Sequence, residues 1–589
     1  MTEQLKDEIC ANQASRLDKH SVIRDLRTRI GKLITRYWAE AVIVAFALLL
    51  WAPRLTGPID LRWDAGVYYV LGTSLANGDG YRILSEPGSP EALEYPPLLP
   101  AFVALHQRVL GTTAPRVVAL WLRRSYVALF VAFALAVLAL AKRHLRPWFA
   151  IVAAALCLFQ IMTIFLSDLL FAELPLALVS VVFVLVVASG LPPSRPWLHE
   201  TTAFVLAAAG FLLRTAGIVL FAAWVIDALT RRRWRLALAR GALALVPIAL
   251  WQAHVERVRT SDEYVHPTYE YQRARYQNYN VTYSENVRLL NPFRPERGLI
   301  DAPTLVERVK TNFGKMPTAL GGAVSTNLGY WGMFLRDLQR RLPRWAVIPR
   351  GVLLVPIFGL AALVIGGVVV FICLGNWTLA SVVLLSIALI CLTPWPEEFG
   401  RYLMPIVPFL TIAAIVAWDR IQAALRGSVW ISAMVRTSIV GLLVLVFTVQ
   451  IYAALSAFRL RGVAFAPSGG DSGDFRFFYH DEAWGAWEQA AAWIRAHAAP
   501  GEIVATIAPH QLYLQTGLRA VYPPMDADPE NARRLLEAVP VSYVIIDEFR
   551  YRDFSRHYAR PAVESDPVGW PLVYWVNGTQ IYEHVTRAE

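Results

Sequence analysis

Residues 127–140 read VALFVAFALAVLAL and contain no charged side chain. Similar apolar runs cover residues 41–51 and 351–374. Because about 20 consecutive apolar residues span the hydrocarbon core of a bilayer, runs of this kind indicate membrane helices. The sequence therefore predicts a protein that crosses a membrane several times.

The composition supports this class. The chain has 589 residues, of which 56% are hydrophobic, more than is usual for soluble globular proteins. The formal net charge of +11 could indicate nucleic-acid binding, but the arginines fall mostly between apolar runs, where they act as topology signals. We expect membrane lipids and no nucleic acid as partners. The four cysteines have no paired spacing, which predicts neither a disulfide framework nor a cysteine metal site.

The apolar runs predict about eleven spans. The two beside Arg214 are short, and could instead form one long helix or a broken pair. The predicted spans cover residues 38–56, 117–141, 148–166, 174–190, 201–213, 216–229, 236–253, 347–374, 377–393, 401–418 and 430–457.

Positive charge predicts the orientation of these spans. Basic segments share one side, which the positive-inside rule makes cytoplasmic; they are residues 24–36, 142–146, 231–235 and 420–426. A group on the opposite side (Arg340, Arg341, Arg344, Arg350) lies in a long loop, and long loops translocate largely regardless of charge. We expect a cytoplasmic tail over residues 1–37, a transmembrane domain over residues 38–458 with outer loops 57–116 and 254–346, and a periplasmic domain over residues 459–589.

The C-terminal tail has the pattern of a small α/β domain. Residues 482–498 and 529–538 predict helices, the second with Asp528 as its cap. Residues 503–507 and 543–546 predict short buried strands, and Asn577-Gly578 between two apolar runs predicts a type I′ hairpin.

The first outer loop offers a candidate base. Asp64 directly follows the first span, with Tyr68 beside it and Glu94-Tyr95 further along the same loop. A carboxylate at the membrane surface can meet both a lipid headgroup and a water-borne acceptor, which suits a general base. Asp64 could equally be a solvated loop acid or a helix cap.

A second pair of acids, Asp168 and Glu173, follows the third span. Charges bordered by apolar helices are costly and often functional. The structural alternative is a turn in which Ser167 or Asp168 caps the fourth span.

Two arginines are candidate phosphate ligands. Arg214 interrupts a long apolar stretch, and Arg401-Tyr402 opens the tenth span, where a cation opposes the helix dipole. Both are predicted on the outer side, where they could hold a lipid phosphate. The alternatives are a snorkelling Arg214 and an Arg401 paired with Glu397 or Glu398.

The loop over residues 254–346 is rich in tyrosine, which suits sugar rings, a membrane interface or packing within the loop. The tyrosines are Tyr264, Tyr269, Tyr271, Tyr276, Tyr279 and Tyr283. His254, His266 and His510 have no metal-ligand spacing, and we expect them to be structural.

In their order along the chain, these residues resemble the GT-C glycosyltransferases, specifically the bacterial group similar to protein mannosyltransferases, lipid A aminoarabinose transferases and the RgtA/B/C/D-like family. The resemblance covers roughly residues 40–420, and the tail is similar to the outer α/β domains attached to many such enzymes. It rests on Asp64 before Tyr68-Tyr69, the Gly78 to Tyr81 turn, Tyr95-Pro96-Pro97, Ser167-Asp168, Arg214-Thr215 and Arg401-Tyr402-Leu403-Met404-Pro405.

The resemblance implies an α-helical polytopic GT-C enzyme of the bacterial inner membrane that transfers a hexose or pentose from a polyprenyl-phosphate donor. It places Asp64 at the catalytic position and Asp168 at the second acidic position. Ala65 stands where some relatives have a second acid, so a mechanism that needs paired acids is in doubt. A glycan, lipid or protein is the expected acceptor, inversion is the expected outcome, and the part of a divalent metal is left open.

Two other classes compete with this interpretation. A transporter or flippase would be expected to show charges near the bilayer midplane and internal repeats, whereas the charges here gather at one face. A membrane-anchored scaffold would explain the outer domain but not the shared side of Asp64, Asp168, Arg214 and Arg401.

Overall fold

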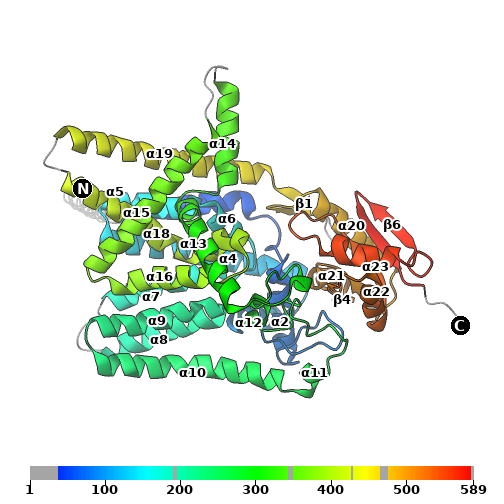
Figure 1. Ribbon diagram of the computed structural model, residues 1–589. Helices are drawn as coiled ribbons and strands as arrows, with labels where there is room; N and C mark the ends of the chain where they lie inside the picture. Colours follow the sequence, from blue (N-terminus) through cyan, green and yellow to red (C-terminus); the bar gives the residue numbers. More distant parts are fainter. Residues whose placement is uncertain (1–36, 190–195, 343–348, 426–428, 465–474, 586–589) are drawn as a thin grey trace, which may run out of the picture.

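The computed structural model describes residues 37–189, 196–342, 349–425, 429–464 and 475–585 (Figure 1). Residues 1–36 of the predicted tail, with their basic segment and Cys10, lie outside the described residues, as does Arg344. Long helices run side by side through the larger part of the molecule, and a small sheet domain lies at one end of them.

Apolar helices form the membrane part. Six are long and apolar enough to cross a bilayer, or seven when α5 (Pro147–Phe159) and α6 (Ile161–Asp168), which meet at 53°, count as one span. The six are Tyr37–Arg54, α4 (Pro115–His144), α10 (Trp234–Arg259), Gly351–Cys373 containing α15 (Leu354–Cys373), Pro396–Ala424 containing α17 (Phe399–Leu403) and α18 (Val407–Ala424), and Ala433–Arg459 within α19 (Val429–Arg459). Shorter apolar helices are α3 (Leu98–Leu110), α7 (Glu173–Ser189), α8 (Pro196–Leu213), α9 (Ile218–Thr230) and α16 (Trp377–Cys391).

Each predicted span coincides with one of these helices or with the bent pair, so the polytopic helical fold is confirmed. The count of about eleven crossings stays a prediction, because four of the matching helices are shorter than a full span. Pro147, Pro196 and Pro396 each lie in the first turn of a helix, where the missing N–H of proline costs no hydrogen bond.

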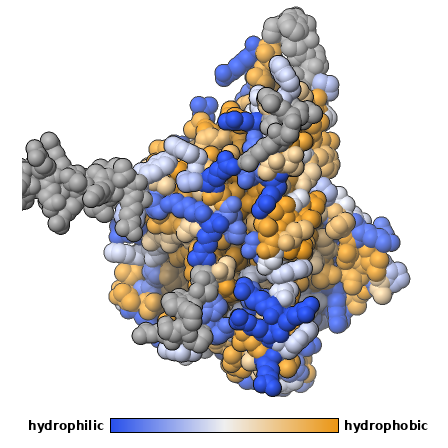
Figure 2. Space-filling model, turned by 90° about the vertical axis from the view of Figure 1, so that its left-hand side faces the viewer, coloured by the Kyte–Doolittle hydropathy of each residue, from blue (hydrophilic) through white to orange (hydrophobic). Residues whose placement is uncertain are grey.

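The described basic segments gather at the helix ends far from the sheet domain. Arg146, which follows α4, pairs with Asp419 of α18 at 3.7 Å, and Lys142 pairs with Glu40 of the first helix at 2.5 Å. Figure 2 looks onto this end and shows hydrophilic side chains clustered among apolar ones. The described residues of these predicted basic segments therefore lie together at one end of the helix bundle.

The second outer loop contains more helix than the sequence indicates. Within residues 254–346 the structure has α11 (Asp262–Val265), α12 (Tyr283–Val287), α13 (Ala302–Val324) and α14 (Leu328–Arg341). The buried residues of α13 are concentrated in its C-terminal half, from Met316 to Val324, which is too short a stretch to give a span signal. At Gly321 this helix approaches α15 so closely that a Cβ would lie 2.2 Å from the Ile357 carbonyl oxygen.

The C-terminal domain is the predicted α/β unit. β1 (Gly462–Ala464) pairs with β2 (Phe475–Phe477), and a second sheet has the order β4-β3-β5-β7-β6, parallel among its first three strands and antiparallel thereafter. Asn577 and Gly578 have φ values of 44° and 87°, as the predicted type I′ turn requires. Its elements are α20 (Glu482–His497), β3 (Ile503–Ala505), α21 (Pro509–Thr516), β4 (Arg519–Val521), α22 (Pro529–Ala538), β5 (Val541–Ile546), α23 (Arg560–Glu564), β6 (Leu572–Val576) and β7 (Thr579–Glu583).

The sheet domain packs directly on the first outer loop. Val67 and Leu71 of α2 (Asp64–Asn77) share one apolar cluster with Trp484, Trp487 and other residues of the sheet domain. The backbone N–H of Ala520 in β4 donates to the Ser85 carbonyl at 2.8 Å. The start of α2 is therefore enclosed between the membrane helices and the sheet domain.

Candidate functional site

Asp64 is the first residue of α2 and lies where three parts of the chain meet. The preceding residue, Trp63, has a φ of 56°, a region that residues with a Cβ seldom adopt. Arg62 holds the turn by pairing with Asp60 at 2.7 Å and donating to the Phe478 carbonyl of the sheet domain at 2.6 Å. These contacts place the Asp64 carboxylate at a helix N-terminus, where the helix dipole favours its charged form.

Two arginines and two carboxylates form a continuous charge cluster around this position. Arg401 of α17 donates from Nη2 to Asp64 and from Nε to Glu173, each at 2.5 Å. Arg214 donates from Nη1 to the same oxygen of Glu173. Glu173, the first residue of α7, therefore links the two guanidinium groups.

Burial is graded across the cluster. The Glu173 side chain is 1% exposed, whereas those of Arg401 and Arg214 are 17% and 21% exposed. The carboxylate that orients the arginines thus lies innermost, and the guanidinium groups lie nearer to solvent. Such an arrangement can hold the two cations for a bound anion.

The surroundings shift the pKa values of two carboxyl groups of the first outer loop, those of Asp64 and Glu94. Burial raises the pKa of Asp64, but the Arg401 guanidinium, helped by Arg552 and Arg214, more than offsets this and holds the pKa below its usual range. Burial and the nearby Asp64 carboxylate raise the pKa of Glu94 well above its usual range, and its Oε2 atom is buried without a hydrogen-bond partner. Asp64 is therefore ionised at neutral pH, while the surroundings of Glu94 favour its neutral form.

Arg214 lies in a tight turn between two helices. It has an extended backbone between α8 and the short helix Thr215–Gly217 that precedes α9. The chain reverses here so closely that a Cβ at Gly217 would lie 2.2 Å from the Gly210 carbonyl oxygen. The two short predicted spans are thus separate helices that fold back on each other, and the Arg214 guanidinium lies 5.2 Å from the Tyr402 ring.

Aromatic side chains border Asp64 on its other side. The Tyr279 hydroxyl donates to Asp64 Oδ1 at 3.1 Å, and the Tyr95 ring lies 4.7 Å from the Tyr68 ring and 6.0 Å from the Tyr279 ring. The structure therefore brings the predicted residues Asp64, Glu173, Arg214, Arg401 and Tyr402 together with Tyr68, Glu94 and Tyr95.

Asp168 lies in a separate buried cluster. It pairs with Arg123 at 3.1 Å, with Arg461 at 3.6 Å and with Arg54 at 4.0 Å. The three arginines also donate to backbone carbonyls at the ends of the first helix and α6. None of the described hydrogen bonds or ion pairs of Asp168 reaches Asp64, so Asp168 lies at a joint between helix ends.

Comparison with solved structures identifies the architecture. The oligosaccharyltransferase AglB from Archaeoglobus fulgidus, in complex with an inhibitory peptide and a dolichol-phosphate, aligns over 94% of this chain and 75% of its own, with a TM-score of 0.52 and 12% identity. The same enzyme tethered to an acceptor peptide gives a TM-score of 0.51 over the same shares, at 13% identity. This chain has the GT-C fold.

ArnT from Cupriavidus metallidurans bound to undecaprenyl phosphate aligns over 92% of this chain and 98% of its own, with 14% identity and a TM-score of 0.49. The assignment of the fold rests on the two archaeal structures. No protein family model and no curated protein sequence matches the chain.

Several residues of this site have no distinct signal in the sequence. Of the tyrosine-rich stretch, Tyr279 reaches Asp64, whereas Tyr269 and Tyr271 pack against the sheet domain, a contact that the sequence does not predict. His510 of the sheet domain lies 4.8 Å from the Tyr279 ring, although its sequence position marks it as incidental. Arg552, which acts electrostatically on Asp64, is one arginine among many in the tail.

The described residues contain no group of three or more His, Cys, Asp or Glu side chains placed to hold a metal ion. The carboxylates nearest to the centre, Asp64 and Glu173, are paired with arginines instead. The site as described is therefore a cluster of charged side chains that can bind an anion and accept a proton.

Proposed function

We propose that the protein is an integral membrane glycosyltransferase that moves a sugar from a polyprenyl-phosphate donor to an acceptor hydroxyl. The observation that carries this proposal is the linked cluster of Asp64, Arg401, Glu173 and Arg214 at the outer end of a GT-C helix bundle. It combines an ionised carboxylate with two partly exposed guanidinium groups, which are the groups that the reaction requires.

Arg214 and Arg401 are the lipid-phosphate ligands in this proposal. In the described contacts Arg401 uses Nε and Nη2 and Arg214 uses Nη1, so each guanidinium, with five N–H donors, retains donors for phosphate oxygens. Glu173 keeps the two groups in fixed positions before the donor arrives. Tyr402 lies beneath the Arg214 guanidinium and limits its movement.

Asp64 acts on the acceptor. The acceptor hydroxyl oxygen forms a bond to the anomeric carbon while the bond from that carbon to the phosphate oxygen breaks. The hydroxyl proton passes to Asp64, and the lipid phosphate leaves as an anion between the two arginines. A single displacement of this kind inverts the anomeric centre.

The pairing of Asp64 with Arg401 has a chemical consequence. Without a donor, the Arg401 charge lowers the pKa of Asp64 and makes it a weak base. A phosphate bound to Arg401 offsets that charge, so the pKa of Asp64 rises and its basicity increases. Donor binding thus activates the base that takes the proton of the attacking acceptor hydroxyl.

The test uses the full-length protein in liposomes with labelled polyprenyl-phosphate sugars. We expect Asp64→Asn to abolish transfer and Asp79→Asn, which changes an exposed carboxylate of the same loop, to retain it. Equal transfer by folded Asp64→Asn protein would remove Asp64 from the mechanism. Movement of the lipid-linked sugar across the bilayer without chemical change would favour the flippase alternative.

We further propose that the site faces the periplasm of a bacterial inner membrane. The sheet domain and Asp64 lie on the side opposite the described basic segments, which supports this orientation. A single cysteine introduced at exposed Arg534 should react with a membrane-impermeant maleimide in intact spheroplasts. Labelling only after lysis would contradict the orientation.

A further inference from the structure

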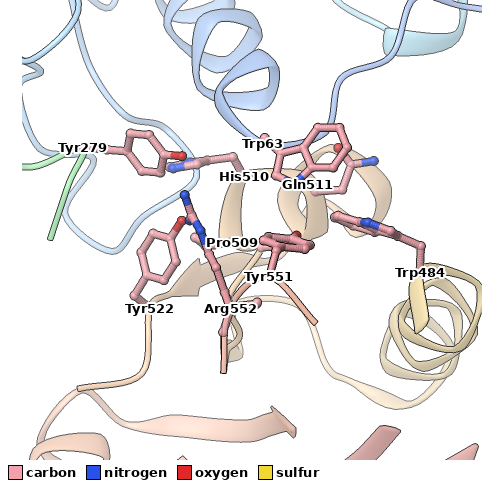
Figure 3. A pocket seen from close by; sticks show the side chains of 11 residues that line it. Trp63, Tyr279, Trp484, Pro509, His510, Gln511, Tyr522, Tyr551 and Arg552 are labelled. Carbon is pink, nitrogen blue, oxygen red and sulfur yellow. The ribbon is translucent and has the colours of Figure 1, made fainter. Parts of the chain in front are cut away.

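A small cavity lies beside Asp64, between the first outer loop and the sheet domain. Its volume is about 20 Å³, and its walls include Trp63 and Tyr279 on one side and Trp484, Tyr522 and Tyr551 on the other (Figure 3). Tyr279 belongs to both the cavity and the charge cluster, because its hydroxyl donates to Asp64. Tyr279 therefore connects the wall of this cavity to the proposed base.

The walls are mostly aromatic faces. The Trp63 ring lies 5.7 Å from the Trp484 ring and 6.2 Å from the Tyr551 ring, and the Tyr279 and Tyr522 rings stack at 6.0 Å. Tyr551 is 46% exposed, so one aromatic face is open at the edge of the cavity. Aromatic faces with polar edges suit the apolar face of a sugar ring.

Arg552 gives the cavity its charge. Its guanidinium lies beside the Tyr522 hydroxyl and points toward Tyr279 and His510 (Figure 3). Burial lowers the pKa of His510 to about 3, so among the lining residues Arg552 alone carries a charge at neutral pH. No ion pair joins Arg552 to a carboxylate in the described part of the chain.

Two further polar atoms at the cavity have no partner. His510 is 3% exposed; its Nδ1 atom is hydrogen-bonded to the Ser85 hydroxyl at 2.7 Å, and its Nε2 atom is buried without a partner. The Gln511 side-chain oxygen is likewise buried and unpartnered. Buried polar groups are seldom left unpaired in a native protein, so these atoms indicate a polar ligand.

We propose that this cavity is the acceptor subsite and that it takes a saccharide carrying a negative charge. The inference rests on the proposed function, since it assigns Asp64 to a hydroxyl of the bound saccharide. A volume of about 20 Å³ is too small for a sugar ring, so the ring lies at the open edge against Tyr551 and its anionic substituent points toward Arg552. The sheet domain thereby selects the acceptor.

The test compares two sugars that share a ring and differ in charge. Binding of glucuronate and of glucose to the full-length protein in nanodiscs is followed by saturation-transfer NMR, with glucose 6-phosphate as a third probe. We expect glucuronate or glucose 6-phosphate to bind at least about tenfold more tightly than glucose, since a charge-assisted pair is the stronger interaction. The better of the two anions identifies a carboxylate or a phosphate as the preferred substituent.

Variants assign the preference to Arg552. Arg552→Gln should remove the discrimination between charged and neutral sugars, whereas Arg534→Gln, at an exposed arginine of the same domain, should keep it. Trp484→Leu should weaken binding of all three sugars. Equal binding of charged and neutral sugars by the unaltered protein, or a preference that survives Arg552→Gln, would overturn the inference, as would transfer to a peptide in place of a saccharide.

Binding of labelled undecaprenyl phosphate separates this inference from the proposed function. It should be lost in Arg401→Gln and kept in Arg552→Gln. If the unaltered protein does not bind the lipid phosphate but binds glucuronate more tightly than glucose, the proposed donor site is wrong and the proposed saccharide subsite is supported.

Discussion

Asp64 is controlled by cations that come from distant parts of the chain. Arg401 contacts it directly across 337 residues of sequence, while Arg214 and Arg552 act at longer range. Burial alone raises the pKa of a carboxyl group, as the neighbouring Glu94 shows. The pKa values of Asp64 and Glu94 therefore shift in opposite directions, because Arg401 contacts Asp64 and the described ion pairs include none to Glu94.

Replacing Arg401 should shift the pH dependence of transfer. In the unaltered enzyme the pKa of Asp64 lies below its usual range, so activity should fall only when the pH drops below the ordinary carboxyl pKa of about 4. In Arg401→Gln, burial dominates and the pKa rises, so the acid limb of residual kcat/KM should move toward neutral pH. The measurement is kcat/KM as a function of pH for this variant and for the control Arg297→Gln, at an exposed outer-loop arginine. Identical acid limbs would contradict the assignment of that limb to Asp64.

Glu94→Gln should be tolerated, because burial and the Asp64 carboxylate already favour the neutral form of this acid. The transfer rate should change by less than about tenfold, unlike that of Asp64→Asn. A carboxyl group whose pKa is raised by folding destabilises the protein as the pH rises above its ordinary value, so Glu94→Gln should also raise the Tm at pH 7 to 8 and not at pH 4. A lower Tm at neutral pH would show that Glu94 is ionised.

Elements place the charged residues by ending close to one another. α2 and α7 begin at Asp64 and Glu173, α17 carries Arg401, and the turn between α8 and α9 carries Arg214. The sequence predicts these helix ends well, because caps, prolines and apolar runs are local signals. It leaves open whether the segments beside Arg214 form one helix, a broken pair or two helices that fold back on each other, since that depends on the contact between Gly210 and Gly217.

A methyl group at Gly217 should therefore disturb the phosphate ligand. The Cβ of Gly217→Ala would collide with the Gly210 backbone, which cannot move aside as a flexible side chain would, and overpacking of this kind costs about 1–3 kcal/mol. We expect a lower Tm in detergent and weaker binding of undecaprenyl phosphate. Gly241→Ala in α10 is the matched control, because a Cβ there meets no atom within 4 Å; equal effects of the two substitutions would refute the role of the turn.

At the scale of the whole molecule, the sequence predicts the elements that have local patterns. It does not predict the contacts between segments that are distant in the chain. Periodicity and charge predict the helix bundle, the outer loops and the α/β tail. They do not show that Glu173 bridges Arg214 and Arg401, or that Trp484 and Arg552 from the tail reach the first loop, because such contacts depend on how helices and domains pack. The same limit applies to Asp168, which the sequence places just after a predicted span, as it does Asp64.

Asp168→Asn distinguishes a structural joint from a second catalytic acid. The three buried arginines around Asp168 belong to the first helix, α4 and the segment after α19, so the carboxylate ties together three distant parts of the chain. Removing its charge leaves buried cations uncompensated, which costs about 3–5 kcal/mol. We expect a markedly lower Tm in detergent and a transfer rate per folded molecule within about tenfold of the unaltered enzyme.

A second substitution tests the cause of that loss. Adding Arg461→Gln to Asp168→Asn removes one of the uncompensated charges and should recover part of the Tm, although Arg461→Gln alone should lower it. Because Arg461 also donates to the Pro53 carbonyl, the recovery should be incomplete. An unchanged Tm combined with lost transfer in Asp168→Asn would instead place Asp168 beside Asp64 in the reaction, as its sequence position predicts.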